Sequence, residues 1–360
     1  MKHYRWIRRA AWTGVVVVPL LTAGCGVFSQ NTTKEIDPPP VETQNNASST
    51  MGPIDAAGSE TNASVDPQTG ETQMTVYLLD ENNYLAPVTL RTTLGEKEQL
   101  GKKALEMMVD GGQYADQLPS GFRGVLPKGT EVLGYSEAAD KKLATVDFSQ
   151  TFASYNAGDE RKIVEAIAWT LTGMPNVQGV ELRLGGAKLD EMPEQAYPLD
   201  RPLTRSVGIN LEAADGVDYG QSVPVTLYFS SETPDGEMYY VPVTRLINRT
   251  DDVAKAAIDQ LVLGPLEQSN LIGVMTPDVQ VKSVTPQEDT VTVDLTDDGF
   301  TEGQPEPADM LQAIVLSVTE NMGAAKVQIK LNGKTNILDE NNVSYSEPVG
   351  RPAAINALKS

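Results

Sequence analysis

Thr145-Val-Asp-Phe-Ser149 returns later in the chain as Thr292-Val-Asp-Leu-Thr296. A helical pattern of apolar residues follows both stretches at the same offset: Val164, Ile167, Ala168 and Leu171, then Leu311, Ile314, Val315 and Val318. The ending recurs too, since Val180-Glu-Leu-Arg-Leu-Gly-Gly186 becomes Val327-Gln-Ile-Lys-Leu-Asn-Gly333. A constant offset through a strand, a helix and a second strand indicates two copies of one folding unit.

Each copy predicts the same order of elements. The first copy contains two β-prone runs around a turn, a helix, a loop, two strands, a helix and a strand: 75–79, 84–89, 97–110, 119–127, 130–136, 143–149, a helix from Asp159-Glu160, and 179–185. The order β-α-β-β-α-β predicts an α+β fold with one sheet per repeat and both helices on a single face. The other face of each sheet would be free for a neighbour.

The second copy follows the first, and its matches fix the domain limits. Thr226-Leu-Tyr-Phe229 matches Thr75-Val-Tyr-Leu78, and the exits from the last strands resemble each other, with Ile209-Asn210 in one copy and Ile355-Asn356 in the other. We therefore predict five segments: a leader (1–24), a tether (25–73), a first domain (74–212), a short join (213–223) and a second domain (224–356).

The composition excludes several classes of function. The chain has 28 Lys and Arg against 49 Asp and Glu, a net charge of −21, so nucleic acid and anionic lipid would repel it. Its one His (His3) and one Cys (Cys25) both lie in or at the end of the leader. The domains therefore contain no Ser/His/Asp triad, no Cys nucleophile, no disulfide and no His or Cys zinc site. We predict no cofactor.

Residues 1–25 resemble a bacterial lipoprotein signal peptide. A basic start, Met1 to Arg9, precedes an apolar run, Ala10 to Leu21, that is too short to span a bilayer. The run closes on Leu21-Thr-Ala-Gly-Cys25, a lipobox in which Thr22 replaces the usual Leu. We predict cleavage before Cys25 and attachment of lipid to Cys25. The alternatives are a signal peptide that ends in an incidental Cys, or a short uncleaved anchor. The following stretch, 26–73, lacks hydrophobic periodicity, which predicts a disordered tether.

Acidic residues are the remaining candidates for catalysis. Asp147 and Asp294 end the matched central strands, but a glycosidase needs two carboxylates about 5 to 10 Å apart in one cleft. We therefore expect each Asp to fix a strand end or the following turn. Asp251-Asp252 is interpreted as a helix start and Asp297-Asp298 as part of a turn before Gly299, and neither predicts a metal site.

Aromatic residues are the other candidate ligand surface. Trp169 lies beside the inward stripe of its helix, so packing explains it better than sugar stacking. Tyr197, Tyr239 and Tyr240 fall in predicted loops or edge strands, where a partner protein could contact them. No glycine-rich phosphate loop follows a strand.

Several phrases resemble the GerMN-domain family of sporulation and spore-germination lipoproteins. They are the lipobox at Cys25, Glu35-Ile-Asp-Pro-Pro39, Gly121-Phe-Arg-Gly-Val-Leu-Pro127, Ala168-Trp-Thr-Leu-Thr172, Arg205-Ser-Val-Gly-Ile-Asn-Leu-Glu212, Tyr239-Tyr-Val-Pro-Val-Thr244 and Glu347-Pro-Val-Gly-Arg-Pro352. The resemblance covers nearly the whole chain. It implies two GerMN domains, each similar to the ring-building motif of secretion-system proteins.

The resemblance also implies a function. It is that of a non-enzymatic scaffold, lipid-anchored through Cys25 to the outer face of the mother-cell membrane, in the space around the forespore. Such a scaffold helps assemble or localise the channel-like complex that joins the two cells. Its expected partners are the proteins of that complex, in a ring of like or unlike subunits. The alternative is a cell-wall or cortex glycan protein, either a binder or a weak hydrolase that uses acids such as Asp147.

Overall fold

The computed structural model describes residues 63–65, 71–95 and 98–359. The predicted leader, Cys25 and most of the predicted tether lie outside these residues. Within the described part of the chain, no helix is both long and apolar enough to cross a membrane.

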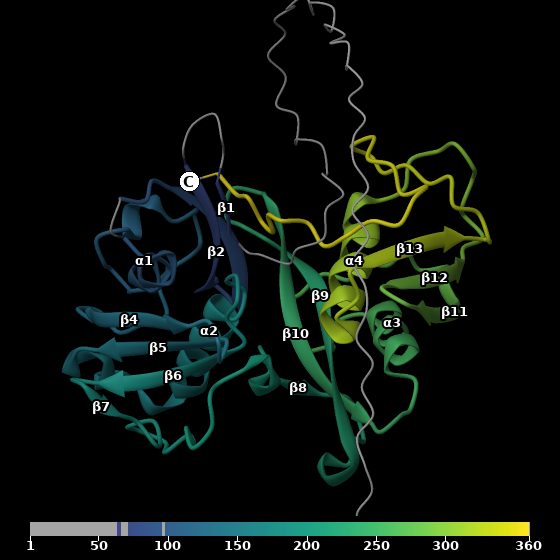
Figure 1. The fold of residues 1–360 in the computed structure, drawn as a ribbon. Helices are drawn as coiled ribbons and strands as arrows, with labels where there is room; N and C mark the ends of the chain where they lie inside the picture. Colours follow the sequence, from purple (N-terminus) through teal and green to yellow (C-terminus); the bar gives the residue numbers. More distant parts are fainter. Residues whose placement is uncertain (1–62, 66–70, 96–97, 360) are drawn as a thin grey trace, which may run out of the picture. The chain divides into compact units, whose positions relative to one another are not determined.

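The first repeat carries its elements in the predicted order (Figure 1). They are β2 (Thr72–Leu79), β3 (Leu85–Thr92), α1 (Leu100–Met107), β4 (Val132–Ala138), β5 (Leu143–Phe148), α2 (Glu160–Leu171), β6 (Gly179–Leu184) and β7 (Ala187–Lys188). A short strand, β1 (Ala63–Val65), precedes them and pairs antiparallel with β2. It falls within the stretch predicted to be a tether.

The second repeat has the same plan, preceded by a strand at the join. Its elements are β8 (Glu212–Ala213), β9 (Ser222–Glu232), β10 (Met238–Asn248), α3 (Val253–Leu263), β11 (Gln280–Gln287), β12 (Thr290–Thr296), α4 (Ala308–Met322) and β13 (Lys326–Leu331). The predicted join therefore contains part of β8, a turn of 3₁₀ helix (Tyr219–Gln221) and the start of β9. The domain limits stay predictions.

The α+β class and the two tandem repeats agree with the prediction, but the strands of each repeat divide between two sheets. In the first repeat the orders are β1-β2-β3 and β4-β5-β6-β7, and in the second they are β8-β10-β9 and β11-β12-β13. β5 and β12 pair antiparallel with the strand before and parallel with the strand after. The prediction of a single sheet in each repeat is therefore wrong: each repeat has a mixed sheet and, separate from it, a sheet built on an antiparallel hairpin.

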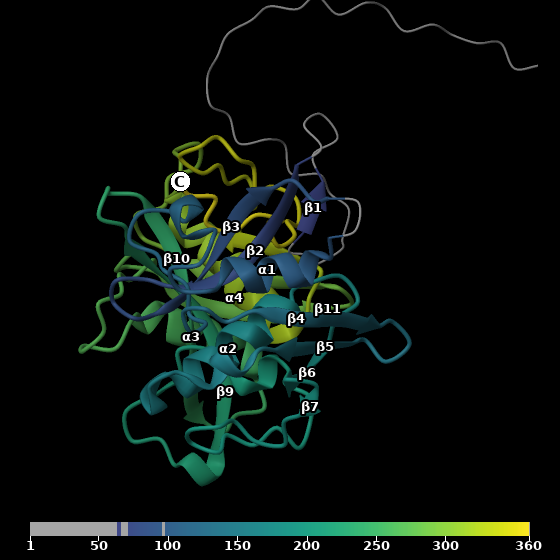
Figure 2. The same cartoon turned by 90° about the vertical axis from the view of Figure 1, so that its left-hand side faces the viewer.

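The helices explain why the hairpin is separate. α1 and α2 each contact β2 on one side and a strand of the mixed sheet on the other, β4 for α1 and β6 for α2 (Figure 2). Nearly every residue of β2 is buried, on both of its faces. An uninterrupted apolar run predicts a buried strand, but it does not tell which sheet the strand joins.

The mixed sheets keep one apolar face against the helices. Ala144, Val146 and Phe148 of β5 are buried, while Thr145 and Asp147 between them are partly exposed. On the helix side, Ile167 of α2 and its match Ile314 of α4 are fully buried. The predicted inward helix faces are therefore confirmed.

Two acidic side chains stabilise helix starts in different ways, and among the described α-helices only α3 has a side-chain N-cap. The side chain of Asp252 caps α3 by accepting a hydrogen bond from the amide of Lys255 at 3.0 Å, which confirms the predicted helix start. At the start of α2, the buried carboxylate of Glu160 accepts bonds from three backbone amides (residues 194, 195 and 197) and from the hydroxyl of Tyr155. Burial alone would raise the pKa of Glu160, but these bonds hold that pKa below its ordinary value.

Candidate functional site: the inter-repeat interface

Two matched Pro-Val-Thr stretches, Pro87–Thr89 on β3 and Pro242–Thr244 on β10, lie where the repeats meet. Thr89 exchanges backbone and hydroxyl hydrogen bonds with Ile355 of the second repeat: the amide of Ile355 donates to the Thr89 Oγ1 at 2.9 Å, and the Thr89 amide donates to the Ile355 carbonyl at 3.2 Å. Thr244 makes the same two bonds with Ile209 of the first repeat, at 3.0 and 2.8 Å. The contacts are therefore reciprocal.

The two asparagines that follow these isoleucines extend the reciprocal pattern. The side-chain amide of Asn210 donates to the carbonyls of Leu85 and Pro242, both at 2.8 Å, and its Oδ1 accepts from the Leu85 amide at 2.9 Å. Asn356 bonds in the same way to the carbonyls of Tyr240 and Pro87, at 2.8 and 2.7 Å, and accepts from the Tyr240 amide. Each Asn thus joins β3 to β10.

Asparagine suits this position for two reasons. Asn210 and Asn356 have φ angles of 46° and 54°, in the left-handed region that Asn tolerates better than most residues. Its side chain also offers two N–H donors and a carbonyl acceptor, which satisfy one backbone amide and two carbonyls at once. A backbone group left unpaired at this buried joint would cost about 1 to 3 kcal/mol.

One buried carboxylate breaks the symmetry. Glu320 of α4 accepts from Arg205 of the first repeat at 2.6 Å and from Arg351 of its own repeat at 3.1 Å. Burial favours the neutral acid, but the two guanidinium groups hold the pKa of Glu320 below its ordinary value. Arg205 lies over the ring of Trp169, and Arg351 lies over the ring of Tyr228.

The match of Glu320 in the first repeat is Gly173, which has no side chain. The first repeat therefore supplies one cation to this cluster and no anion, while the second repeat supplies a cation and the anion. We call the contacts of Thr89, Thr244, Ile209–Asn210, Ile355–Asn356 and the Arg205–Glu320–Arg351 cluster the inter-repeat interface.

A second patch joins the hairpin turn of the first repeat to the second repeat. Asp80, which is buried, accepts from the Tyr239 hydroxyl at 2.9 Å, and Phe122 meets the Tyr239 ring edge to face. Gly121 has a φ of +82°, and a Cβ there would lie 2.7 Å from Pro234. Burial raises the pKa of Asp80, against the bonds that lower it. The two repeats therefore also approach closely here.

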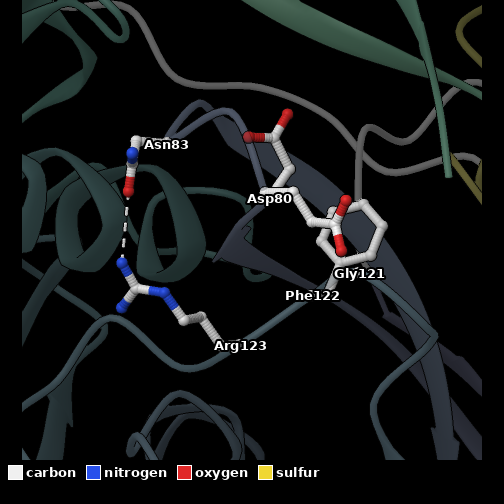
Figure 3. Close-up of a pocket in the computed structure, with 6 residues that line it drawn as sticks. Asp80, Asn83, Gly121, Phe122 and Arg123 are labelled. Atoms are coloured by element: carbon white, nitrogen blue, oxygen red, sulfur yellow. Dashed lines mark hydrogen bonds between the residues drawn. The ribbon is translucent and has the colours of Figure 1, made fainter. Parts of the chain in front are cut away.

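A shallow, open pocket of about 410 Å³ lies on this patch (Figure 3). Its lining comes from the turn between β2 and β3 and from the loop between α1 and β4: Asp80, Glu81, Asn83, Gly121, Phe122 and Arg123. Arg123 donates to the side-chain oxygen of Asn83 at 3.2 Å, so the cation is turned toward its own repeat. Within the described residues, no group of three acidic, His or Cys side chains is placed to hold a metal ion.

Comparison with known proteins identifies this two-repeat arrangement. The family model described as "Germane: Sporulation and spore germination" matches residues 75–190 and 226–337, one segment in each repeat. The chain belongs to the Germane family. It is 35% identical over 350 residues to the spore germination protein GerM of Bacillus subtilis (strain 168), covering 94% of both chains.

A solved structure of the tandem GerMN domains of the sporulation protein GerM from Bacillus subtilis also matches this Germane chain. The TM-score is 0.72 at 37% identity, and the match covers 79% of this chain and 99% of the solved one. The relationship therefore extends through both repeats.

The predicted acidic candidates of this Germane protein have structural partners. The Oδ1 of Asp147 accepts from the amide of Gly186 at 2.8 Å and so fixes the turn after β6. Asp294 forms an ion pair with Lys282 of the neighbouring strand at 2.8 Å. The Oδ1 of Asp297 accepts from the amide of Gly299 at 2.7 Å, as the predicted turn requires.

The aromatic candidates divide into confirmed and wrong predictions. Trp169 is buried and donates to the carbonyl of Gly208 at 2.8 Å, so the packing interpretation is confirmed. Tyr239 and Tyr240 are buried, with hydroxyls on Asp80 and on Asp309, so their expected role as partner contacts is wrong. Tyr197 is half-buried against the core of the first repeat.

Sequence reasoning did not find the inter-repeat interface, although it found its parts. The matched exits at Ile209-Asn210 and Ile355-Asn356, and the two Pro-Val-Thr stretches, are visible as repeated phrases. The repeated asparagine, Asn210 and Asn356, is the useful signal. A polar residue that recurs at the same place in both copies, outside the apolar pattern of the core, indicates an interface. Glu320 carries no such signal, because it occurs in one repeat only. The lipidation candidate Cys25 lies outside the described residues.

Proposed function

We propose that this Germane protein is a non-enzymatic, lipid-anchored scaffold that helps assemble or localise the membrane complex joining mother cell and forespore, with effects on spore germination. The observation that carries the proposal is the reciprocal inter-repeat interface. It joins two similar domains through buried hydrogen bonds and a buried ion cluster, so that the chain presents two related surfaces together. Membership of a sporulation and germination family sets the cellular context.

The surfaces available for contact are the faces of the mixed sheets that point away from the helices. They carry a partly exposed threonine at matched places, Thr145 on β5 and Thr292 on β12. The neighbouring carboxylates of Asp147 and Asp294 are engaged within their own sheets, by the Gly186 amide and by Lys282. Two weak sites held in one chain gain avidity when the partner is itself repeated, as in a ring. Proteins of the complex, in a ring of like or unlike subunits, are the proposed partners.

The lipid anchor places this scaffold at the outer face of the mother-cell membrane. If Cys25 is the lipidation site, Cys25→Ala abolishes incorporation of a labelled fatty acid and leaves the precursor uncleaved or cut elsewhere. Ser29→Ala, four residues away, is the matched control and should label like the wild type. Equal label on the Cys25→Ala protein would end the lipoprotein proposal.

Two kinds of variant in a sporulating strain distinguish a scaffold, which acts by binding, from an enzyme, which acts by catalysis. One kind deletes a domain, and the other replaces the candidate acidic residues. Deletion of 74–212 or of 224–356 should reduce heat-resistant spores as far as loss of the whole chain does, and should disperse the complex. The double variant Asp147→Asn, Asp294→Asn keeps the size of both side chains and should sporulate like the wild type. A folded double variant that fails as badly as the deletions would replace the scaffold with the glycan hydrolase.

A further inference from the structure

The inter-repeat interface is self-sufficient, because no residue of the connection between the repeats takes part in it. Each repeat contributes one strand, β3 or β10, and one exit segment, Ile209–Asn210 or Ile355–Asn356. The reciprocal contacts have the form of a two-fold dimer interface, in which each partner offers the same pair of elements. Such an interface needs two repeats, but they need not belong to one chain.

The connection itself is short and lies at one end of β10. β8 pairs in parallel with β10, through Arg245 opposite Glu212, and the amide of Ala214 donates to the carbonyl of Leu246 at 2.9 Å. β9 pairs with the other side of β10, from Ser222 opposite Asn248. Residues 215–221 therefore carry the chain around the end of β10, from one neighbouring strand to the other, and the Gln221 carbonyl accepts there from the Arg249 amide at 3.0 Å.

The ion cluster disfavours the pairing of two first repeats. A first repeat paired with another first repeat would bring two copies of Arg205 together with Gly173 in place of the acid. Two buried cations without an anion are strongly unfavourable. A first repeat paired with a second repeat reproduces the observed cluster of Arg205, Glu320 and Arg351, whichever chain each repeat comes from.

We propose that the inter-repeat interface is exchangeable between copies of this chain: the first repeat of one copy pairs with the second repeat of another. Two chains that exchange reciprocally close into a dimer with both interfaces filled. If the exchange is not reciprocal, each chain pairs with a different neighbour at each repeat, and an open linear assembly forms. The connection at 215–221 normally directs the pairing within one chain, so in the wild type each chain fills this interface with its own two repeats.

The experiment removes the connection and keeps both repeats in one chain. Deleting 215–221 joins Ala214 directly to Ser222, which lie in or next to strands on opposite sides of β10. Two strand spacings amount to about 9 to 10 Å, whereas one peptide step spans about 3.8 Å, so β8 and β9 of one chain cannot both stay paired with the same β10, and pairing within one chain would require β8 to leave β10. Sedimentation velocity should then show a twofold or larger increase in mass. Because the interface is still filled, thermal unfolding should keep a single transition.

Two control variants make the result decisive. Replacing 215–221 by a longer Gly/Ser linker should restore the monomer, since intramolecular pairing is again allowed. Adding Glu320→Gln and Asn210→Ala to the deletion should return it to a monomer, because the interface is damaged. A deletion variant that is monomeric at every concentration, or that associates equally well with the damaged interface, overturns the proposal. The assay uses purified protein, so its failure leaves the proposed function in sporulation untouched.

Discussion

Glu320→Gln is expected to split the unfolding of the described domains into two transitions. In the wild type the buried interface couples the repeats, so we expect one cooperative transition. Removing the carboxylate leaves Arg205 and Arg351 without their shared anion, and breaking a buried pair in this way costs about 3 to 5 kcal/mol. The loss should lie toward the lower end, because the Arg205 side chain is 29% exposed. Differential scanning calorimetry measures the number of transitions.

The matched control for this variant is Glu302→Gln in the same repeat. Glu302 is paired with Lys334 at 3.8 Å, and its side chain is 52% exposed. An exposed pair of this kind contributes about 0 to 1 kcal/mol, so the single transition should persist. If Glu320→Gln also unfolds in one transition at the wild-type temperature, the ion cluster does not couple the repeats.

The difference in stability between the wild type and Glu320→Gln should depend on pH. A group whose folded pKa is lowered stabilises the fold above its unfolded pKa, about 4.3 for Glu, and loses that contribution as the pH falls through the folded value. The difference should thus be full at pH 7 and shrink below about pH 4. Asp80 and Glu165, whose pKa values are raised mainly by burial, change in the opposite sense but are common to both proteins. Unfolding titrations over this pH range measure the difference.

Ile314→Asp is expected to unfold the second repeat. Ile314 is fully buried in α4, and an unpaired carboxylate there should cost about 3 to 5 kcal/mol, a large part of the stability of a small domain. Because the interface couples the repeats, the first repeat should also melt earlier. Circular dichroism melting checks both effects.

Leu263→Asp provides the matched control for Ile314→Asp. Leu263 ends α3 of the same repeat and is 72% exposed, so an aspartate there remains in water and should cost about 1 kcal/mol or less, mainly through the negative end of the helix dipole. Equal melting temperatures for the two aspartate variants would mean that the apolar stripe of α4 has been assigned to the wrong face.

Periodicity predicted the helices and the individual strands of the mixed sheets well, for a physical reason. Strands such as β5 and β12 have one face on the helices, so buried and partly exposed residues alternate along them. The stripe containing Ile167 and its match Ile314 fixes the helix faces in the same way. Asp147 was correctly expected to fix a turn, because an acid at a strand end has backbone amides within reach.

The arrangement of the hairpins could not be predicted in the same way. β2 and β9 are covered on both faces, so their sequences show continuous burial and contain no information on which neighbour covers each face. The interface residues were hidden for a related reason. Asn210 bonds to Leu85 and Pro242, which are distant in sequence. The role of Glu320 becomes visible only in the structure, where Arg205 of one repeat and Arg351 of the other both contact its carboxylate.

We infer that the two repeats act as one joined unit. The most direct test of this inference is a count of heat-resistant spores from a strain whose only copy carries Glu320→Gln, compared with one that carries Glu302→Gln at equal protein level. Our account predicts a loss approaching that of a domain deletion for Glu320→Gln, and wild-type counts for Glu302→Gln. Wild-type counts from a Glu320→Gln protein whose repeats unfold separately would contradict it.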